Sequence, residues 1–441
     1  MAFGFVLNKL PENGIGDVLM QSNKELLERA TKIIPRGCQA MSKCASMWPS
    51  GEYFPLMVES ENGCEMIDIR GRKFINLMSG SGPAILGAND RDVERAIKEQ
   101  LKNGVCFSLP IMTEIEFGEY LRDDIYKRPD LQVKYCSNGT DAVSGAIRAA
   151  RSYARKTHIL INRKSYHGWS DSIAAASDRN CGIPEDLKQY IGFCDYNNLQ
   201  QLEDELKTGK YACFLQELVS LEEPNEGYLA GVQELCHKYG AIWIADEVIT
   251  GLRWSICGAA GMYNVEPDLT CLGKAISGGL PLAAVIGKEE YMKEFENIFF
   301  SGTNFGSPIS IAAGFAAVKK LNNLKDKIYP HIWKQGNRFK KAFDYRCKEL
   351  SIDARMVGMA PRLNVKFNYS VCVKDLFYQE MIKHGIFIGT QIYTTWAIKK
   401  HHMDKIITAS NESLEIVASA IKDGTDKYLE GKPSIQIFNR R

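Results

Sequence analysis

The sequence predicts an α/β fold in which a mostly parallel sheet is covered by helices on both faces, with a second, smaller α+β domain beside it. Short, continuously apolar runs alternate with longer segments that have apolar residues at helical spacing. This alternation is typical of βαβ units whose strands are buried on both faces. From about residue 326 the pattern changes to a basic amphipathic helix, short strand-like runs and a final helix near 411–430. The change predicts a separate domain.

The elements can be placed in order along the chain. An apolar run at 134–136 ends in Ser-Asn-Gly-Thr and is followed by a helical pattern over 142–155. Further strands and one helix follow. The basic segment after them predicts a helix over 331–350. We expect strands at 157–163, 211–215, 241–248, 269–272 and 282–287, a helix at 231–240, and small-domain strands at 354–359, 362–368 and 385–389.

Composition excludes several classes of protein. With 55 Lys+Arg against 53 Asp+Glu in 441 residues, the charge gives no case for a nucleic-acid or membrane-surface partner. No apolar run approaches the roughly 20 residues of a membrane span, and Asn8, Lys9 and Pro11 interrupt the N-terminal apolar stretch too early for a secretory signal. The thirteen cysteines show no CxxC pair and no zinc spacing. We therefore expect a cytoplasmic protein with reduced cysteines and no metal site.

Lys274 is the first residue that indicates chemistry. It follows the strand expected at 269–272, with Gly273 before it and Gly278-Gly279 after it. A desolvated lysine in such a turn has a lowered pKa and forms a Schiff base with an aldehyde. An ordinary surface lysine in a turn explains the same residues. A P-loop is excluded because the upstream glycine and the following Ser or Thr are missing.

Asp246 ends the apolar run at 241–248. A carboxylate that finishes a buried strand is costly without a cationic partner, and a protonated pyridine nitrogen is such a partner. A helix N-cap or a metal ligand are the alternatives.

Two turns add further candidates. Ser137-Asn138-Gly139-Thr140 lies between a strand and a helix, where backbone N–H groups and the Thr hydroxyl bind phosphate; a simple N-cap explains it equally. Tyr166-His167-Gly168 would stack on a flat ring or simply pack in the core. A phosphate turn, an aromatic pair, an acid and a lysine, in this order, are the parts that pyridoxal phosphate requires.

In these motifs the sequence resembles the class III aminotransferases, which share the fold type I scaffold, and within them the glutamate-1-semialdehyde aminomutase-like subgroup. The resemblance spans roughly residues 30–430 and is specific, because many motifs occur in family order. It is carried by IIPRG, GRKFINL, GSGPAILG, SNGTDAVSGAIRAAR, YHGWSD, ADEVITGLR, PDLTCLGKAISGGLP and SGTNFGSPISIAAG.

The resemblance implies a fold and a set of roles. The fold is a large cofactor-binding domain at 76–325 with a mostly parallel seven-stranded sheet, and a small α+β domain built from 1–75 and 326–441. Lys274 would hold pyridoxal 5'-phosphate and act as acid and base on the substrate carbon, with Asp246 on the ring nitrogen. The other cofactor-binding residues would be Asn138, Gly139, Thr140, Tyr166, His167, Glu217 and Thr303.

Thr303 implies an oligomer. In the family pattern it reaches the phosphate of the neighbouring subunit's cofactor, so the resemblance implies a homodimer with shared active sites. A helix-cap residue before the helical run at 308–314 is the alternative explanation of Thr303.

Three departures concern the substrate. Lys43 stands where the aminomutase has a carboxylate-gripping Arg, Ser81 replaces a Trp, and Thr394 replaces a gating Glu. We take these three as substrate-binding positions that argue against glutamate semialdehyde. Glu217-Leu218 replaces a Glu-Pro pair, which leaves Ser220 and Glu222 as candidates for bonding the ring hydroxyl.

We therefore expect an aminotransferase that moves an amino group from an amino-acid donor, glutamate in the common family choice, to an aldehyde or ketone. An intramolecular aminomutase and a cofactor-binding scaffold without turnover are the alternatives. Lys399-Lys400-His401-His402 would place positive charge near the pocket for a phosphorylated, nucleotide-linked or sugar-like acceptor, or form a solvated loop. Arg362 is a candidate for gripping a donor carboxylate.

Overall fold

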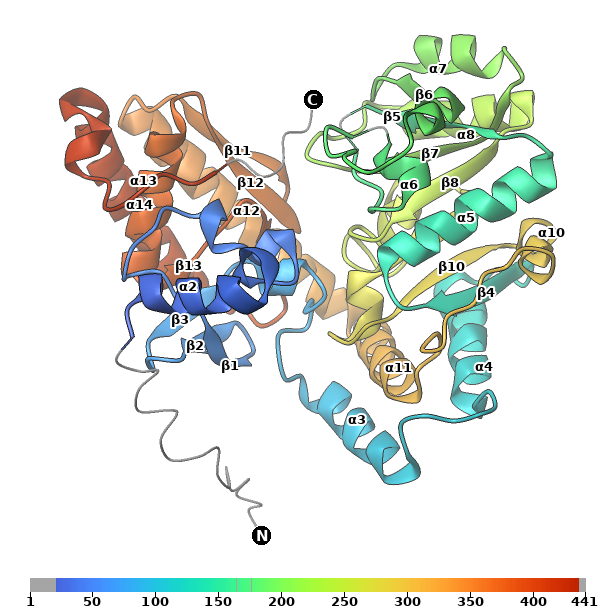
Figure 1. The fold of residues 1–441 in the computed structure, drawn as a ribbon, viewed down its shortest axis with the longest axis horizontal. Helices are drawn as coiled ribbons and strands as arrows, with labels where there is room; N and C mark the ends of the chain where they lie inside the picture. Colours follow the sequence, from blue (N-terminus) through green and yellow to red (C-terminus); the bar gives the residue numbers. More distant parts are fainter. Residues whose placement is uncertain (1–20, 164, 176, 436–441) are drawn as a thin grey trace.

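The computed structural model describes residues 21–163, 165–175 and 177–435. Asn8, Lys9 and Pro11, on which the argument against a secretory signal depends, lie outside the described residues. Figure 1 shows two lobes, one holding the large sheet with α5, α7 and α8, the other holding α2, β1–β3 and α12–α14.

The larger lobe is built on a seven-stranded sheet of order β4-β10-β9-β8-β7-β5-β6. Only β10 runs antiparallel to its neighbours, and the other strand pairs are parallel. The mostly parallel seven-stranded sheet expected from the sequence is confirmed. Its strands are β4 (Leu131–Cys136), β5 (His158–Asn162), β6 (Ile191–Cys194), β7 (Tyr211–Glu217), β8 (Ile242–Glu247), β9 (Leu269–Leu272) and β10 (Ala283–Lys288).

Helices cover both faces of this sheet because its strands are apolar on both sides. Every residue of β7, β8 and β9 is buried. Alternate residues of one strand enter different cores: Ile244 packs in the cluster that includes α5, and Trp243 in the cluster that includes α7 and α8. The helices of this lobe are α3 (Arg91–Asn103), α4 (Met112–Glu119), α5 (Gly139–Ala154), α6 (Asp171–Ala174), α7 (Leu199–Leu206), α8 (Tyr228–Tyr239), α9 (Gly258–Tyr263), α10 (Glu289–Met292) and α11 (Pro308–Asn323).

The smaller lobe is built from the N-terminal and the C-terminal parts of the described chain. A four-stranded sheet of order β1-β2-β3-β13 takes three strands from the N-terminal part and one from the C-terminal part, with Ile386 of β13 opposite Ile75 of β3. A second sheet has the order β11-β12-β14. The strands are β1 (Val58–Asn62), β2 (Glu65–Asp68), β3 (Lys73–Asn76), β11 (Ala354–Met359), β12 (Arg362–Phe367), β13 (Ile386–Phe387) and β14 (Ile392–Tyr393); the helices are α2 (Asn23–Ile33), α12 (Lys325–Glu349), α13 (Val371–Lys383) and α14 (Lys400–Asp423).

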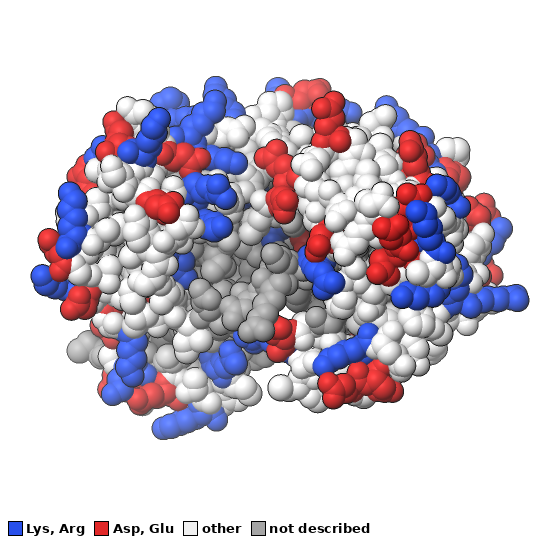
Figure 2. All heavy atoms as spheres, turned by 90° about the horizontal axis from the view of Figure 1, so that it is seen from above, with Lys and Arg blue, Asp and Glu red and all other residues white. Residues whose placement is uncertain are grey.

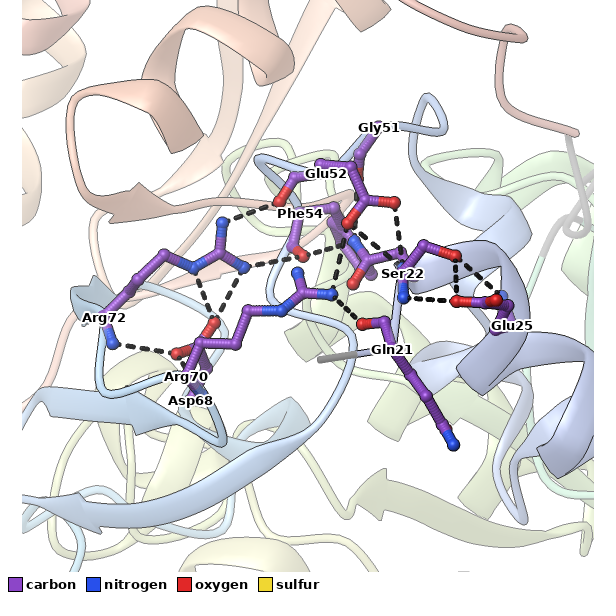
Figure 3. A network of polar contacts seen from close by, with 10 residues as sticks. Gln21, Ser22, Glu25, Gly51, Glu52, Phe54, Asp68, Arg70 and Arg72 are labelled. Carbon is purple, nitrogen blue, oxygen red and sulfur yellow. Dashed lines mark hydrogen bonds and ion pairs between the residues drawn. The ribbon is translucent and has the colours of Figure 1, made fainter. Parts of the chain in front are cut away.

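The helix α2 is fixed to this lobe by a polar network (Figure 3). Ser22 caps the helix in a capping box with Glu25. Asn23 donates to the carbonyl oxygens of Gly51 and Phe54 at 2.8 and 2.9 Å. Because these bonds reach residues about 30 positions away, they position the start of α2 rather than merely stabilise it.

Several expected elements differ from the structure in their limits, and the largest difference is at the final helix. The final helix, expected near 411–430, is α14 and begins at Lys400. The Lys399–His402 segment is therefore the start of a helix and not a solvated loop: His402 is buried, with Cys64 Sγ 3.3 Å from its Nδ1, and Lys399 Nζ lies 3.6 Å from the centre of the Trp396 ring.

Two further features concern the surface of the molecule and its helices. Basic and acidic side chains are interspersed over the face drawn in Figure 2. None of the described helices combines the length and apolarity that a bilayer crossing requires.

Candidate active site

The candidate site lies at the carboxyl ends of the central strands, where ligands bind in open α/β sheets. Glu217 at the end of β7 is in register with Asp246 of β8, and Asp246 with Cys271 of β9. The chain then leaves β9 through Gly273 into the single helical turn Lys274–Ser277. The register brings two carboxylates and a lysine to one edge of the sheet.

Lys274 is held in a half-buried and conformationally unusual position. Its backbone φ is +45°, a left-handed value that few non-glycine residues adopt. Burial, the largest effect, lowers the pKa of Lys274 to about 8, against the opposing attraction of Asp246. At pH 7 roughly a tenth of an amine with this pKa is the unprotonated nucleophile, a few hundred times more than for a free lysine.

Gly82 and Tyr393 enclose the Lys274 side chain from the smaller lobe. A Cβ atom at Gly82 would lie 3.1 Å from Lys274 Cδ and 3.2 Å from Tyr393 Cε1. The absence of a side chain at Gly82 therefore provides the room that Lys274 occupies.

Asp246 is buried and held by two donors. His167 Nδ1 lies 2.7 Å from Asp246 Oδ2, and the Val248 N–H donates to Oδ1 at 3.0 Å. Since an ionised carboxylate only accepts, His167 carries its proton on Nδ1. The sequence left His167 as either a stacking or a packing residue; here it orients the acid. A carboxylate accepts about four hydrogen bonds, so Asp246 retains capacity for a further donor.

Glu217 is also buried, with a different set of partners. Its Oε1 accepts from the Tyr166 N–H at 3.0 Å, and its Oε2 lies 3.4 Å from Arg362 Nη1. Tyr166 itself remains 52% exposed. Ser220 and Glu222, the candidates for bonding the ring hydroxyl, follow β7 and contact each other through the Glu222 N–H and the Ser220 hydroxyl at 3.5 Å.

In the Ser137–Thr140 turn, the Asn138 side chain caps a helix, whereas Gly139 and Thr140 form the first residues of that helix. Asn138 is the N-cap of α5: its side chain accepts from the Asp141 N–H at 3.0 Å and donates to the Asp141 carboxylate at 2.8 Å. The capping explanation thus accounts for the Asn138 side chain. Gly139 lies against Val248, where a Cβ would meet Val248 Cγ1 at 2.7 Å, and the Thr140 hydroxyl lies beside Gly168.

Arg253 joins the parts of the site and was not singled out from the sequence. It is fully buried, and it donates to the carbonyl oxygens of Thr394 at 3.2 Å and of Gly82. Its guanidinium lies 5.0 Å from the Tyr393 ring centre. Arg253 therefore holds both segments that enclose Lys274. Its place at the end of ADEVITGLR was the only sequence signal.

Four predicted residues remain, namely Lys43, Ser81, Thr394 and Thr303. Lys43 is exposed, and its charge acts on Glu61. The Ser81 hydroxyl donates to the hydroxyl of Ser42, the residue before Lys43, at 3.2 Å. The Thr394 hydroxyl donates to the Ala360 carbonyl at 2.8 Å. Thr303 is exposed in a turn before α11.

Comparison with known proteins accounts for this arrangement. The family profile described as "Aminotransferase class-III" matches residues 47–414. The chain belongs to the class III aminotransferases.

Relatives and solved structures extend this result. The chain is 30% identical to a glutamate-1-semialdehyde 2,1-aminomutase of Saccharolobus islandicus, over 92% of this chain and 98% of that protein. A transaminase with PLP bound superposes with a TM-score of 0.82 at 24% identity, covering 91% of this chain and 99% of that one. A glutamate-1-semialdehyde aminomutase of Pseudomonas aeruginosa PAO1 superposes with a TM-score of 0.79 at 20% identity, covering 89% and 94%.

As a class III aminotransferase the chain is a pyridoxal-phosphate-dependent enzyme with the fold type I architecture, and its residues fit that cofactor. A buried acid with unused acceptor capacity matches a protonated pyridine nitrogen. A half-buried lysine whose amine has a lowered pKa matches an aldehyde. The N-terminus of α5 at Gly139 and Thr140, which are half-buried, matches a phosphate.

Proposed function

We propose that this class III enzyme is an aminotransferase that moves an amino group from an amino-acid donor, glutamate, to an aldehyde or ketone acceptor. The observation that carries the proposal is Lys274, whose buried amine has a pKa lowered to about 8 next to the Asp246 carboxylate. The aldehyde and the electron-withdrawing ring of pyridoxal phosphate supply the chemistry that the side chains lack.

Different residues of this chain would bind the cofactor, orient it and move protons. Asp246, oriented by His167, would keep the ring nitrogen protonated. Lys274 would give up its bond to the cofactor when the donor amine arrives, and would then move a proton at the substrate carbon. Tyr166 would cover the ring, while Gly139 and Thr140 would bind the phosphate. Asn138 would contribute by capping α5, and Glu217 by fixing the Tyr166 backbone.

The acceptor is proposed to be larger or less acidic than glutamate semialdehyde. Lys43 is exposed, and its charge acts on Glu61. Ser81 and Thr394 are smaller than the side chains they replace in the aminomutase pattern. A sugar-like, phosphorylated or nucleotide-linked intermediate would suit the extra room.

The aminomutase remains the second candidate because curated relatives at 30% identity carry that name. An aminomutase differs from an aminotransferase in needing no separate acceptor, since it returns the nitrogen to the same carbon skeleton. Release of a keto acid therefore separates the two functions.

We propose that the enzyme acts as a homodimer, with Thr303 reaching the neighbouring subunit's cofactor phosphate. Exposed apolar side chains support this proposal, because monomers seldom expose many neighbouring apolar side chains. Phe299, close to Thr303 in sequence, is 83% exposed. The segment from α3 to α4 exposes Leu101, Val105, Phe107, Leu109, Met112 and Ile115.

The test is an absorbance spectrum of the cofactor-loaded enzyme, repeated after single amino acids are added without an acceptor. We expect glutamate to bleach the band of the lysine-bound cofactor and to release 2-oxoglutarate. A band that no amino acid changes would contradict the aminotransferase and favour the aminomutase. No band after loading would contradict the role of Lys274 itself, for which Lys274→Ala is the control.

A further inference from the structure

A cavity of about 330 Å³ lies between α5, α6 and the short 3-10 helix Glu185–Tyr190 (Figure 1). Its volume is within the size range of pockets for small ligands. The part of α5 that lines the cavity is one face of the helix, because residues three and four positions apart are neighbours on a helix. The side chains on this face are those of Ser144, Ile147, Arg148 and Arg151.

Arg148 and Arg151 bring two positive charges to this cavity without an acidic partner. Arg148 Nη1 donates to the Phe299 carbonyl at 2.6 Å, and Arg151 Nε donates to the Thr157 carbonyl at 2.7 Å. Within the described part of the chain these are the only hydrogen bonds of the two guanidiniums, and neither forms an ion pair. Burial, the largest effect, lowers the pKa of Arg151, and the charge of Arg148 lowers it further. Two neighbouring like charges are unfavourable without a counter-charge, so the pair indicates an anionic ligand.

The unused donors at the cavity suit a phosphate group. The bond through Nε leaves both terminal nitrogens of Arg151 for a ligand, and planar forks of N–H donors match phosphate oxygens in pairs. A chain of hydroxyls adds another donor: Ser144 donates to Ser170 at 3.0 Å, and the Ser170 and Ser172 hydroxyls are 3.3 Å apart. Because each hydroxyl has one hydrogen, a chain that runs in this direction leaves the Ser172 hydrogen for the ligand.

The rest of the lining indicates what is attached to the phosphate. Ile147 is buried and Leu187 is half-buried, and both are apolar. Apolar side chains beside a few polar groups are typical of sites for organic molecules rather than for bare ions. Asp171 is exposed and is the only carboxylate among the described residues that line the cavity. The lining therefore keeps an excess of one positive charge, which favours an anion.

We propose that this cavity is a binding site for a phosphate monoester. The phosphate group lies between Arg148 and Arg151, and the carbon portion of the ligand packs on Ile147 and Leu187. Such a ligand neutralises the two guanidiniums and fills the apolar part of the cavity at the same time. The proposal does not depend on which reaction the enzyme catalyses, so its test requires no turnover.

Titration calorimetry of the cofactor-loaded enzyme at constant ionic strength measures the binding directly. The probes are phenyl phosphate and inorganic phosphate, and we expect phenyl phosphate to bind more tightly because it also covers the apolar lining. Arg148→Gln and Arg151→Gln should each weaken phenyl phosphate binding about 10- to 100-fold. Asp171→Asn should strengthen it, because a repelling carboxylate is removed. Arg155→Gln, at the exposed C-terminal cap of the same helix, is the matched control and should bind phenyl phosphate as the wild type does.

Chemical protection gives a second readout that needs no variant and so holds even if Arg151→Gln does not fold. Phenylglyoxal reacts with arginine side chains, and peptide mass spectrometry locates the modified residues. Phenyl phosphate should protect Arg148 from the reagent and leave Arg155 reactive. Arg148 that reacts equally with and without phenyl phosphate would overturn the proposal, as would an affinity that Arg155→Gln lowers as much as Arg148→Gln. Equal affinities for phenyl phosphate and inorganic phosphate would contradict the monoester.

Discussion

Asp246 and Glu217 stand side by side in register at the ends of two parallel strands, yet they are held by different partners. His167 bonds to Asp246, while the Tyr166 N–H and Arg362 contact Glu217. Adjacent residues of one turn thus supply a separate donor to each acid. The Tyr166-His167 pair keeps two neighbouring buried carboxylates in fixed and different orientations.

Replacement of His167 by Phe should leave Asp246 Oδ2 buried without its donor. We expect a loss of about 1–3 kcal/mol in the free energy of unfolding and weaker binding of pyridoxal phosphate, measured by denaturant titration and by cofactor dialysis. His384→Phe is the control, since its contact with Glu412 lies at the surface and should contribute less than about 1 kcal/mol. Equal losses in the two variants would contradict the role of His167.

Gly82→Ala should lower the free energy of unfolding by more than the backbone strain at a positive φ accounts for. Both Gly82 and Gly279 have positive φ, +112° and +105°, but a Cβ at Gly279 would meet nothing within 4 Å. Gly279→Ala should show only the strain of roughly 1–3 kcal/mol, whereas Gly82→Ala adds an overpacking cost of about 1–3 kcal/mol. Because that added contact falls on Lys274, Gly82→Ala should also slow cofactor loading. Similar loading rates in both variants would show that Gly82 does not confine the lysine.

The rate of pyridoxal phosphate uptake by the cofactor-free enzyme should rise with pH. The unprotonated amine is the nucleophile, and the lowered pKa of Lys274 places the midpoint at about 8, whereas a free lysine would give roughly 10.4. Asp246→Asn should move the midpoint lower, because Asp246 raises the pKa of Lys274. Stopped-flow absorbance across this range measures both midpoints.

The same pKa makes a prediction for stability. The unfolded chain holds the Lys274 proton more tightly than the folded chain does, so burial of this amine destabilises the fold fully below about pH 8. The penalty fades as the pH rises from about 8 toward roughly 10.4. Lys274→Met should remove this pH dependence from the free energy of unfolding, and an unchanged dependence would assign it to other groups.

Mixed dimers test the shared active site. If Thr303 serves the neighbouring subunit, a dimer of one Lys274→Ala subunit and one Thr303→Ala subunit contains one site with both residues intact. Random mixing makes half of the dimers mixed, each with half of its sites intact, so activity should return to about a quarter of the wild-type value. Recovery no greater than the sum of the two parent variants would place Thr303 in its own subunit's site or outside any site.

The sheet was predictable because its signal is local. Continuous apolar runs located β5, β7, β8, β9 and β10, and β9 was placed to the residue at 269–272. The strand β7 runs two residues past the expected end, to Glu217. Glu217 is charged, and its burial depends on partners such as Arg362 that the local pattern does not contain.

The start of α14 was not predicted because it too depends on contacts with residues that are distant in sequence. The run of cationic side chains at 399–402 is typical of a solvated loop, but His402 is buried by contacts with the distant residues Cys64 and Glu65. Lys274 and Asp246 were found because each follows an apolar strand. Arg253 was missed because its function is to bond carbonyl oxygens of Gly82 and Thr394, which only the folded chain brings together.

The pairing of β3 with β13 has a consequence for biosynthesis. Ile75 and Ile386 are neighbours in the sheet but leave the ribosome more than 300 residues apart. At roughly 5–20 residues per second the N-terminal strands wait for at least 15 s before their partner strand exists. Their open edge is then exposed to other nascent chains. A circularly permuted chain that begins near residue 325 would synthesise both halves of this lobe consecutively, and should give a higher soluble yield when translation is slow.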